Sequence, residues 1–320
     1  MRASAIAQPN IALIKYWGKR DIERNLPAVG SISITLRDLF TKMHVVLDSN
    51  LDADSLAVND SQDAAMLPRL SASLDHVIGK DRSRARIVSH CNFPIAAGLA
   101  SSASAFAAIT IAAAAAAGRT LETAELASLA GRSSGSAARS LYGGFVELEN
   151  RESDVALRSL RDRASWPLEV VVAITAKGPK AVGSTEAMEI SRKTSPFYSE
   201  WVEKQEQDLI LARDAIRNRD FQKLAAVAEH NCLKMHSMMW ASRPPTVFWN
   251  STTMRCLQTV RQLQRSGFGV FFTIDAGPQI KAVCLPEHAE EVHSALATTD
   301  GVVDLMLTGL GDAARLLDVE

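Results

Sequence analysis

In the first half of the chain, hydrophobic and polar positions follow two kinds of pattern, one typical of strands and one typical of helices, and segments of the two kinds alternate along the sequence. Short apolar segments rich in β-branched residues are typical of strands, and they occur at 31–36, 42–47, 85–89, 144–148 and 168–175. Helical patterns occur at 63–78, in an alanine-rich run that ends at Gly118, and from about residue 120. Pro68 marks either the true start of the first helix or a kink in it.

The second half has longer helical patterns, with apolar residues at three- and four-residue spacing. They cover 197–218, 221–239 and 252–266, and are followed by strands at 269–274, 281–285 and 302–307 and a helix at 287–297. This mixture predicts an α+β protein in which sheets pack on helices. Gly, Pro and Lys cluster in the segment KGPKAVGS, which is typical of a connecting loop. We therefore predict two domains, residues 1–182 and 183–320.

Composition narrows the class of protein. The 320 residues are 47% hydrophobic and 22% charged, which is typical of a folded globular chain. A net charge of −1 argues against a nucleic-acid-coating surface, and the alanine run is too short to span a membrane. The N-terminal segment lacks the apolar core of a signal peptide, so we expect a cytoplasmic protein. The four cysteines form no C-x-x-C pair and are expected to be reduced thiols.

The segment from Pro94 to Gly118, PIAAGLASSASAFAAITIAAAAAAG, has the composition of a phosphate-binding loop that leads into a helix. Small side chains leave room for an anion, and the unpaired N–H groups and dipole of a helix N-terminus attract it. An ordinary alanine-rich helix with a serine N-cap has a similar sequence, so this segment alone leaves both interpretations open. Neither a Walker A loop nor a Rossmann fingerprint is present.

Two further clusters contain groups that bind anions. The segment NIALIKYWGK brings Lys15, Tyr16 and Lys19 together after a predicted strand, where they either grip an anionic substrate or lie in solvent. The segment SSGSAAR combines hydroxyls and a glycine with Arg139, which can bind a carboxylate or phosphate through two parallel hydrogen bonds. The alternative for this second segment is a helix N-cap followed by an exposed arginine.

One carboxylate, Asp275, follows an apolar strand in the segment FTIDAGPQ. An acid at the end of a buried strand is a candidate proton acceptor or charge organiser, although a turn-forming aspartate fits the same pattern. His230, Cys232 and His236 lack the spacing of a metal site, so the metal we expect is one that arrives with a nucleotide.

Five segments together resemble the diphosphomevalonate decarboxylase family of the GHMP kinase superfamily over nearly all of residues 5–310. They are NIALIKYWGKRD, NFPIAAGLASSASAFAA, GSAARSLYGGFVE, MHSMMWASRPP and FTIDAGPQ, in this order. The resemblance implies a two-domain GHMP kinase fold, with an N-terminal ribosomal-protein-like domain and a C-terminal ferredoxin-like domain. It also implies decarboxylation of (R)-5-diphosphomevalonate with ATP and Mg²⁺, and a homodimer.

The resemblance assigns roles residue by residue. Asp275, Lys15 and Arg139 match the catalytic positions: the acid beside the C3 hydroxyl, the lysine paired with it, and the arginine on the C1 carboxylate. Substrate-binding positions are matched by Asn10, Tyr16, Lys19, Ser134, Ser136, Arg139 and Ser184. The family's positions for binding the ATP phosphates are matched by Pro94, Gly98, Leu99, Ala100, Ser101, Ser102 and Ser104, with Ser102 assigned to the metal ion.

Some positions depart from the family pattern and leave alternatives open. Thr185 stands where several bacterial relatives carry a substrate-binding arginine, which leaves open a decarboxylase acting on 5-phosphomevalonate. A kinase that only phosphorylates the 3-hydroxyl is a second alternative. The presence of both Asp275 and Lys15 argues against such a kinase.

Overall fold

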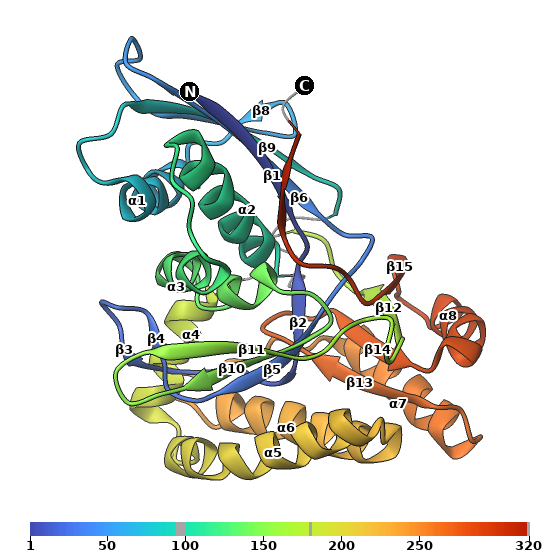
Figure 1. Cartoon of the computed structure of the whole chain (residues 1–320). Coiled ribbons are helices and arrows are strands. Elements are labelled where there is room, and N and C mark those ends of the chain that lie inside the picture. The colour runs from blue at the N-terminus through green and yellow to red at the C-terminus, as the bar shows by residue number, and fades with distance from the viewer. Residues whose placement is uncertain (94–99, 179–180, 319–320) are drawn as a thin grey trace.

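The computed structural model describes residues 1–93, 100–178 and 181–318, in which sheets pack on helices as predicted (Figure 1). The first sheet has the order β16-β1-β6-β9-β7-β8, with β7 and β9 parallel and the other neighbours antiparallel. Its strands are β1 (Arg2–Ala7), β6 (Thr41–Asp48), β7 (Ser55–Val58), β8 (Ser61–Gln62), β9 (Arg84–Cys91) and β16 (Arg315–Leu317). Because β16 pairs with β1 at one edge of this sheet, the two ends of the described chain lie side by side.

Three helices pack beside this sheet: α1 (Leu67–Ile78), α2 (Ser101–Ala116) and α3 (Thr123–Ser133). Pro68 lies in the first turn of α1, so it marks the start of this helix. Most of the alanines of α2 are buried, and their small side chains let the helix lie close to β1 and β6. The N-cap of α2 is Ala100 in a left-handed conformation (φ 53°), which is unfavourable for a residue with a Cβ.

The second sheet, β11-β10-β5-β2, is antiparallel and lies at the centre of the molecule (Figure 1). It comprises β2 (Asn10–Ile14), β5 (Ser31–Thr35), β10 (Phe145–Asn150) and β11 (Val155–Arg161). Every residue of β2 and β5 is buried; β2 (NIALI) is apolar after Asn10, whereas β5 (SISIT) alternates isoleucines with buried hydroxyl residues. A short hairpin of β3 (Lys19–Asp21) and β4 (Leu26–Pro27) follows β2, and the 3-10 helix η1 (Ala137–Leu141) precedes β10.

The third sheet, β13-β14-β12-β15, is antiparallel and contains most of the strands of the second half. Its strands are β12 (Glu169–Ile174), β13 (Val270–Ile274), β14 (Ile280–Cys284) and β15 (Asp304–Gly309). The helices of this half are α4 (Ser184–Thr194), α5 (Tyr198–Asn218), α6 (Phe221–Trp240), α7 (Ser251–Arg265), η2 (Pro286–His288) and α8 (Ala289–Ala297). Helix α6 packs against both β2 and β13, so it joins the second and third sheets.

Several elements were absent from the sequence prediction: the strands β1, β3, β4, β7, β8, β11 and β16 and the 3-10 helices η1 and η2. β1 reads RASAIA and has few β-branched residues, while β11 carries two arginines at a sheet edge, so neither has a typical strand pattern. α3 begins at Thr123, later than predicted, because Glu122 and Glu125 form a capping box. The boundary at residue 182 stays a prediction; β12 precedes it but pairs with β14 and β15.

Within the described ranges, none of the helices combines the length and apolar character needed to cross a membrane.

Candidate active site

A cavity of about 720 Å³ brings together residues that are far apart in the sequence. It lies among β2, the start of α2, the segment between α3 and η1, the start of α4 and the turn after β13. Twelve of the predicted site residues line it: Asn10, Lys15, Tyr16, Lys19, Ala100, Ser101, Ser102, Ser134, Ser136, Arg139, Ser184 and Asp275. Pro94, Gly98 and Leu99 lie outside the described residues.

Ser104 is the predicted residue that is described but does not line the cavity. Its side chain is fully buried, its hydroxyl lies 2.7 Å from that of Thr41, and it donates to the Ser101 carbonyl at 3.1 Å. These contacts connect the first turn of α2 to β6. The structure therefore gives Ser104 a role in holding the helix start rather than a place on the cavity wall.

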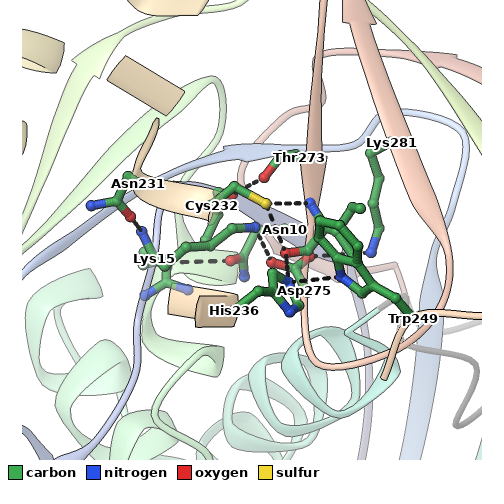
Figure 2. Close-up of polar contacts among 12 residues, drawn as sticks. Asn10, Lys15, Asn231, Cys232, His236, Trp249, Thr273, Asp275 and Lys281 are labelled. Carbon is green, nitrogen blue, oxygen red and sulfur yellow. Dashed lines mark hydrogen bonds and ion pairs between the residues drawn. The ribbon is translucent and has the colours of Figure 1, made fainter. Parts of the chain in front are cut away.

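Asp275 lies between two lysines at the cavity wall (Figure 2). Lys15 Nζ is 2.6 Å from Asp275 Oδ1, and Lys281 Nζ is 3.3 Å from Asp275 Oδ2. Both lysine side chains are buried, whereas the carboxylate is 25% exposed. Burial alone would raise the pKa of Asp275, but the charges and hydrogen bonds of Lys15 and Lys281 outweigh it and hold the pKa well below its usual range. Asp275 is therefore an ionised carboxylate that remains accessible.

The position of Lys15 is fixed by a buried polar network on α5 and α6. Asn231 Oδ1 accepts the Lys15 backbone N–H at 2.8 Å, and Gln205 Nε2 donates to the Lys15 carbonyl at 2.8 Å. Asn231 Nδ2 donates to Gln205 Oε1 and to Asp208 Oδ2, so the two helices share the contact. On the strand side, Thr273 of β13 donates to the Ala12 carbonyl of β2 at 3.0 Å. Asp275 and Lys15 are thus positioned by hydrogen bonds that join side chains of the second half of the chain to backbone groups of the first half.

Arg139 is 2% exposed and donates only to neutral oxygens among the described residues. Its Nη1 donates to Ser31 Oγ at 2.6 Å, and its Nε lies 3.1 Å from Ser33 Oγ and 3.3 Å from Asn10 Oδ1. Burial lowers the pKa of Arg139 to about 10, although nearby Tyr16 and Asp275 act in the opposite direction. A buried cation without a hydrogen-bonded anion is a favourable place for a ligand carboxylate.

Tyr16 presents a buried hydroxyl for which the described part of the chain supplies no hydrogen-bond partner. Burial raises its pKa to about 12, while the charge of Arg139 lowers it. A Cβ at Gly135 would overlap this hydroxyl, so glycine is required there for the tyrosine to occupy its place. Buried polar atoms normally have a partner, which makes the Tyr16 hydroxyl a candidate ligand contact.

Other positively charged residues that line the cavity are Lys19 on β3, Arg69 near the start of α1 and Arg132 near the end of α3. Burial lowers the pKa of Lys19, with Glu189 raising it and Arg69 lowering it further. Arg69 of α1 stacks over the Phe106 ring at 4.8 Å and donates to the Ser133 carbonyl at 3.4 Å. Sequence reasoning missed Arg69 and Arg132, which also lines the cavity, because single arginines on helices have no distinguishing signal.

Comparison with known proteins gives consistent matches over the whole chain. The models for the diphosphomevalonate decarboxylase-like N-terminal domain and the mevalonate 5-diphosphate decarboxylase C-terminal domain match residues 7–159 and 170–304. The diphosphomevalonate decarboxylase of Candida albicans is 33% identical, over 86% of this chain and 82% of its own length. That of Homo sapiens is 32% identical, over 91% of this chain and 78% of its own length.

Solved structures of such enzymes have the same fold. The mevalonate diphosphate decarboxylase of Staphylococcus aureus is 31% identical, with a TM-score of 0.93 over 99% of this chain and 98% of that chain. MDDEF, solved in complex with MVAPP, AMPPCP and magnesium, is 31% identical, with a TM-score of 0.92 over 100% of this chain and 99% of that chain. These likenesses confirm the predicted α+β, two-domain GHMP kinase fold.

Proposed function

The chain belongs to the diphosphomevalonate decarboxylase family, and we propose that the cavity containing Asp275 is where it carries out the family's reaction. It converts (R)-5-diphosphomevalonate and ATP to isopentenyl diphosphate, ADP, phosphate and CO₂. The observation that carries the site assignment is the Lys15–Asp275 ion pair on the cavity wall, with the buried Arg139 lining the same cavity.

The reaction requires a poor leaving group to be activated. Phosphorylation turns the tertiary C3 hydroxyl into a good leaving group, and its departure leaves positive charge at C3 while the carboxylate loses CO₂ to form the alkene. Asp275 accepts a hydrogen bond from the C3 hydroxyl and orients it toward the γ-phosphate of ATP. Lys15 keeps Asp275 ionised and offsets the negative charge between phosphoryl donor and acceptor.

Arg139 and Asn10 are proposed to hold the C1 carboxylate of the substrate. The guanidinium of Arg139 is fixed in one orientation by Ser31, Ser33 and Asn10. Its remaining N–H groups can therefore donate to a carboxylate without further ordering of the side chain. Asn10 is in turn fixed by its bonds to Ser140 Oγ at 2.7 Å and to the Ser136 carbonyl at 3.0 Å. A carboxylate held in this way keeps its breaking C–C bond aligned with C3.

The ATP phosphates and the substrate diphosphate are proposed to bind at different edges of the cavity. Ser101 and Ser102, in the first turn of α2, receive the ATP phosphates at the helix N-terminus, and the Ser102 hydroxyl is an oxygen ligand of the kind that Mg²⁺ prefers. Mg²⁺ would neutralise phosphate charge there. The substrate diphosphate is assigned to a set of hydrogen-bond donors: Tyr16, Lys19, Ser134, Ser136 and Ser184.

One assay tests the reaction. Purified protein is incubated with Mg-ATP and (R)-5-diphosphomevalonate while ADP and CO₂ are followed together. Equal amounts of both products are expected. ADP without CO₂ would identify a kinase that stops at the phosphorylated intermediate, and the absence of both would contradict an enzymatic role.

We further propose a homodimer located in the cytoplasm, on the basis of the family resemblance. Multi-angle light scattering should then give twice the mass of one chain, and a fluorescent fusion should distribute through the cytoplasm. A mass equal to one chain would contradict the dimer.

A further inference from the structure

Lys281 is a fully buried lysine in the middle of the third sheet. It lies on β14, and its strand partner on β13 is Thr273, two residues before Asp275. Side chains two residues apart on a strand share a face, and a long side chain reaches its diagonal cross-strand neighbour. The hairpin therefore places the Lys281 ammonium beside the Asp275 carboxylate, at 3.3 Å from Oδ2 (Figure 2).

Lys281 is a charged residue on a buried strand, β14, whose other residues are apolar. Ile280, Ala282 and Cys284 face an apolar core that includes residues of α7 and α8, and Val283 belongs to the core that contains β2 and α5. A buried charge is costly unless it is paired, so this position requires an anion. Asp275 provides that anion, and its other oxygen is already bonded to Lys15 at 2.6 Å.

We propose that Lys281 is a positioning residue for the decarboxylation, which fixes the Asp275 carboxylate through Oδ2 while Lys15 fixes it through Oδ1. With one cation on each oxygen, the carboxylate plane cannot rotate without breaking an ion pair. The carboxylate then presents a constant orientation to the C3 hydroxyl. This inference rests on the role assigned above to Asp275.

The double pairing also selects between two roles for Asp275. A carboxylate stabilised by two ammonium groups has little tendency to take up a proton, since protonation would leave both cations without a counter-charge. Asp275 acts as an orienting acceptor and fixed charge rather than as a strong base, and the C3 hydroxyl proton passes to an oxygen of the transferred phosphate. The charged or titratable groups around it are Lys15 directly after β2, Lys281 on β14, Cys232 and His236 on α6, and Arg139 on η1.

The first test is the steady-state kinetics of Lys281→Met, which removes the charge and keeps an apolar stem. The Lys15–Asp275 pair remains, so the protein is expected to fold. We expect kcat to fall about 10- to 100-fold with KM for both substrates within about threefold, because Lys281 does not itself contact either substrate. Unchanged kcat, or a loss confined to KM, would overturn the proposal.

The pH profile separates positioning from a general loss of stability. Removing one of two cations raises the pKa of Asp275, so the acid limb of kcat should move upward by about one pH unit or more. Arg82→Met is the matched control, because Arg82 is a buried cation paired with Asp54 and Asp75 outside the cavity lining. The control should keep the wild-type profile; an acid limb that stays at its wild-type position in Lys281→Met would refute the proposal.

Thermal unfolding provides a test that needs no activity. Asp275→Asn leaves two buried cations facing a neutral amide, so its melting temperature should fall. Adding Lys281→Met to that variant restores the wild-type net charge of the cluster and should raise the melting temperature again. A double variant that melts no higher than Asp275→Asn would contradict the coupling.

The two proposals fail in different ways. If Asp275→Asn retains wild-type turnover, the role assigned to Asp275 is wrong. If Asp275→Asn is inactive while Lys281→Met equals wild type, only the inference about Lys281 is wrong.

Discussion

Two sets of residues line the cavity, and they differ in how far their polar groups are already paired. The inner set, Asn10, Lys15, Arg139 and Asp275, is held by hydrogen bonds and ion pairs to residues of several elements. The outer set, Tyr16 and Lys19, offers donors toward the cavity, and the Tyr16 hydroxyl has no partner within the described residues. The inner set is organised before substrate arrives, whereas the outer set is completed by a ligand.

This difference separates two kinds of contribution to catalysis. Groups that are fixed in advance stabilise charge in the transition state without reorganisation, so their loss should reduce kcat. Groups that are completed by the ligand contribute equally to ground state and transition state, so their loss should raise KM. Substitutions in each set test whether the distinction holds.

The largest effect is expected for Asp275→Asn in the inner set. The amide keeps the size of the side chain but removes the charge that orients the C3 hydroxyl, so kcat should fall by about 10² to 10⁴-fold. Binding of ATP, measured by calorimetry, should change little because Asp275 does not hold the nucleotide. Retention of more than about a tenth of the wild-type kcat would remove Asp275 from the inner set.

Arg139→Lys should have the next largest effect, a fall in kcat of about 10²-fold. Lysine keeps the charge but cannot make the two-point contact with a carboxylate or reach both Ser31 and Ser33. Arg163→Lys is a suitable control because Arg163 is exposed and pairs with Asp312 away from the cavity. If weaker nucleotide binding dominates the defect, Arg139 belongs to the phosphate site instead.

For the outer set, Gly135→Ala tests the place of Tyr16. The added methyl group overlaps the Tyr16 hydroxyl, so the ring must move and KM for diphosphomevalonate should rise about tenfold, close to 1.4 kcal/mol. Gly131→Ala is the matched control, because its Cβ would meet only the Ala138 Cβ, at 3.5 Å. Equal kinetics for the two variants would show that Tyr16 does not contact the substrate.

The smallest effect is expected for Lys19→Met, measured with two substrates. Wild type should prefer diphosphomevalonate over 5-phosphomevalonate by at least about tenfold in kcat/KM, since a second phosphate adds charge-assisted hydrogen bonds. Because Thr185 supplies no cation, Lys19 carries much of this preference, and Lys19→Met should reduce it several-fold. A wild-type enzyme that turns over the monophosphate equally well would instead be a phosphomevalonate decarboxylase.

The inner set was predictable only in part, and for a physical reason. Lys15, Arg139 and Asp275 each stand in a segment with a recognisable motif, and the structure brings all three to one cavity. Gln205 and Asn231 lie on amphipathic helices, where a single polar residue has the same appearance whether it faces solvent or a buried backbone group.

Lys281 illustrates the same limit in a strand. In the segment IKAVC a lysine is most simply interpreted as a solvent-facing position, since lysines are mostly exposed. Its burial depends on Asp275, which directly follows the neighbouring strand β13, and on strand register that no local pattern reveals. The strands β1 and β16 were missed for a related reason, because each is a strand only through pairing with distant residues.

The sequence separation of 260 between Lys15 and Asp275 also sets a minimum delay, during synthesis, before the ion pair can form. At about 5–20 residues per second, a ribosome needs roughly 13–52 s to pass from the lysine codon to the aspartate codon. Throughout that interval a nascent chain carries Lys15 but not the acid. The first sheet is completed later still, because β16 can pair with β1 only after residues 315–317 have left the exit tunnel. Nascent chains that lack Asp275 are therefore not expected to consume ATP by this reaction.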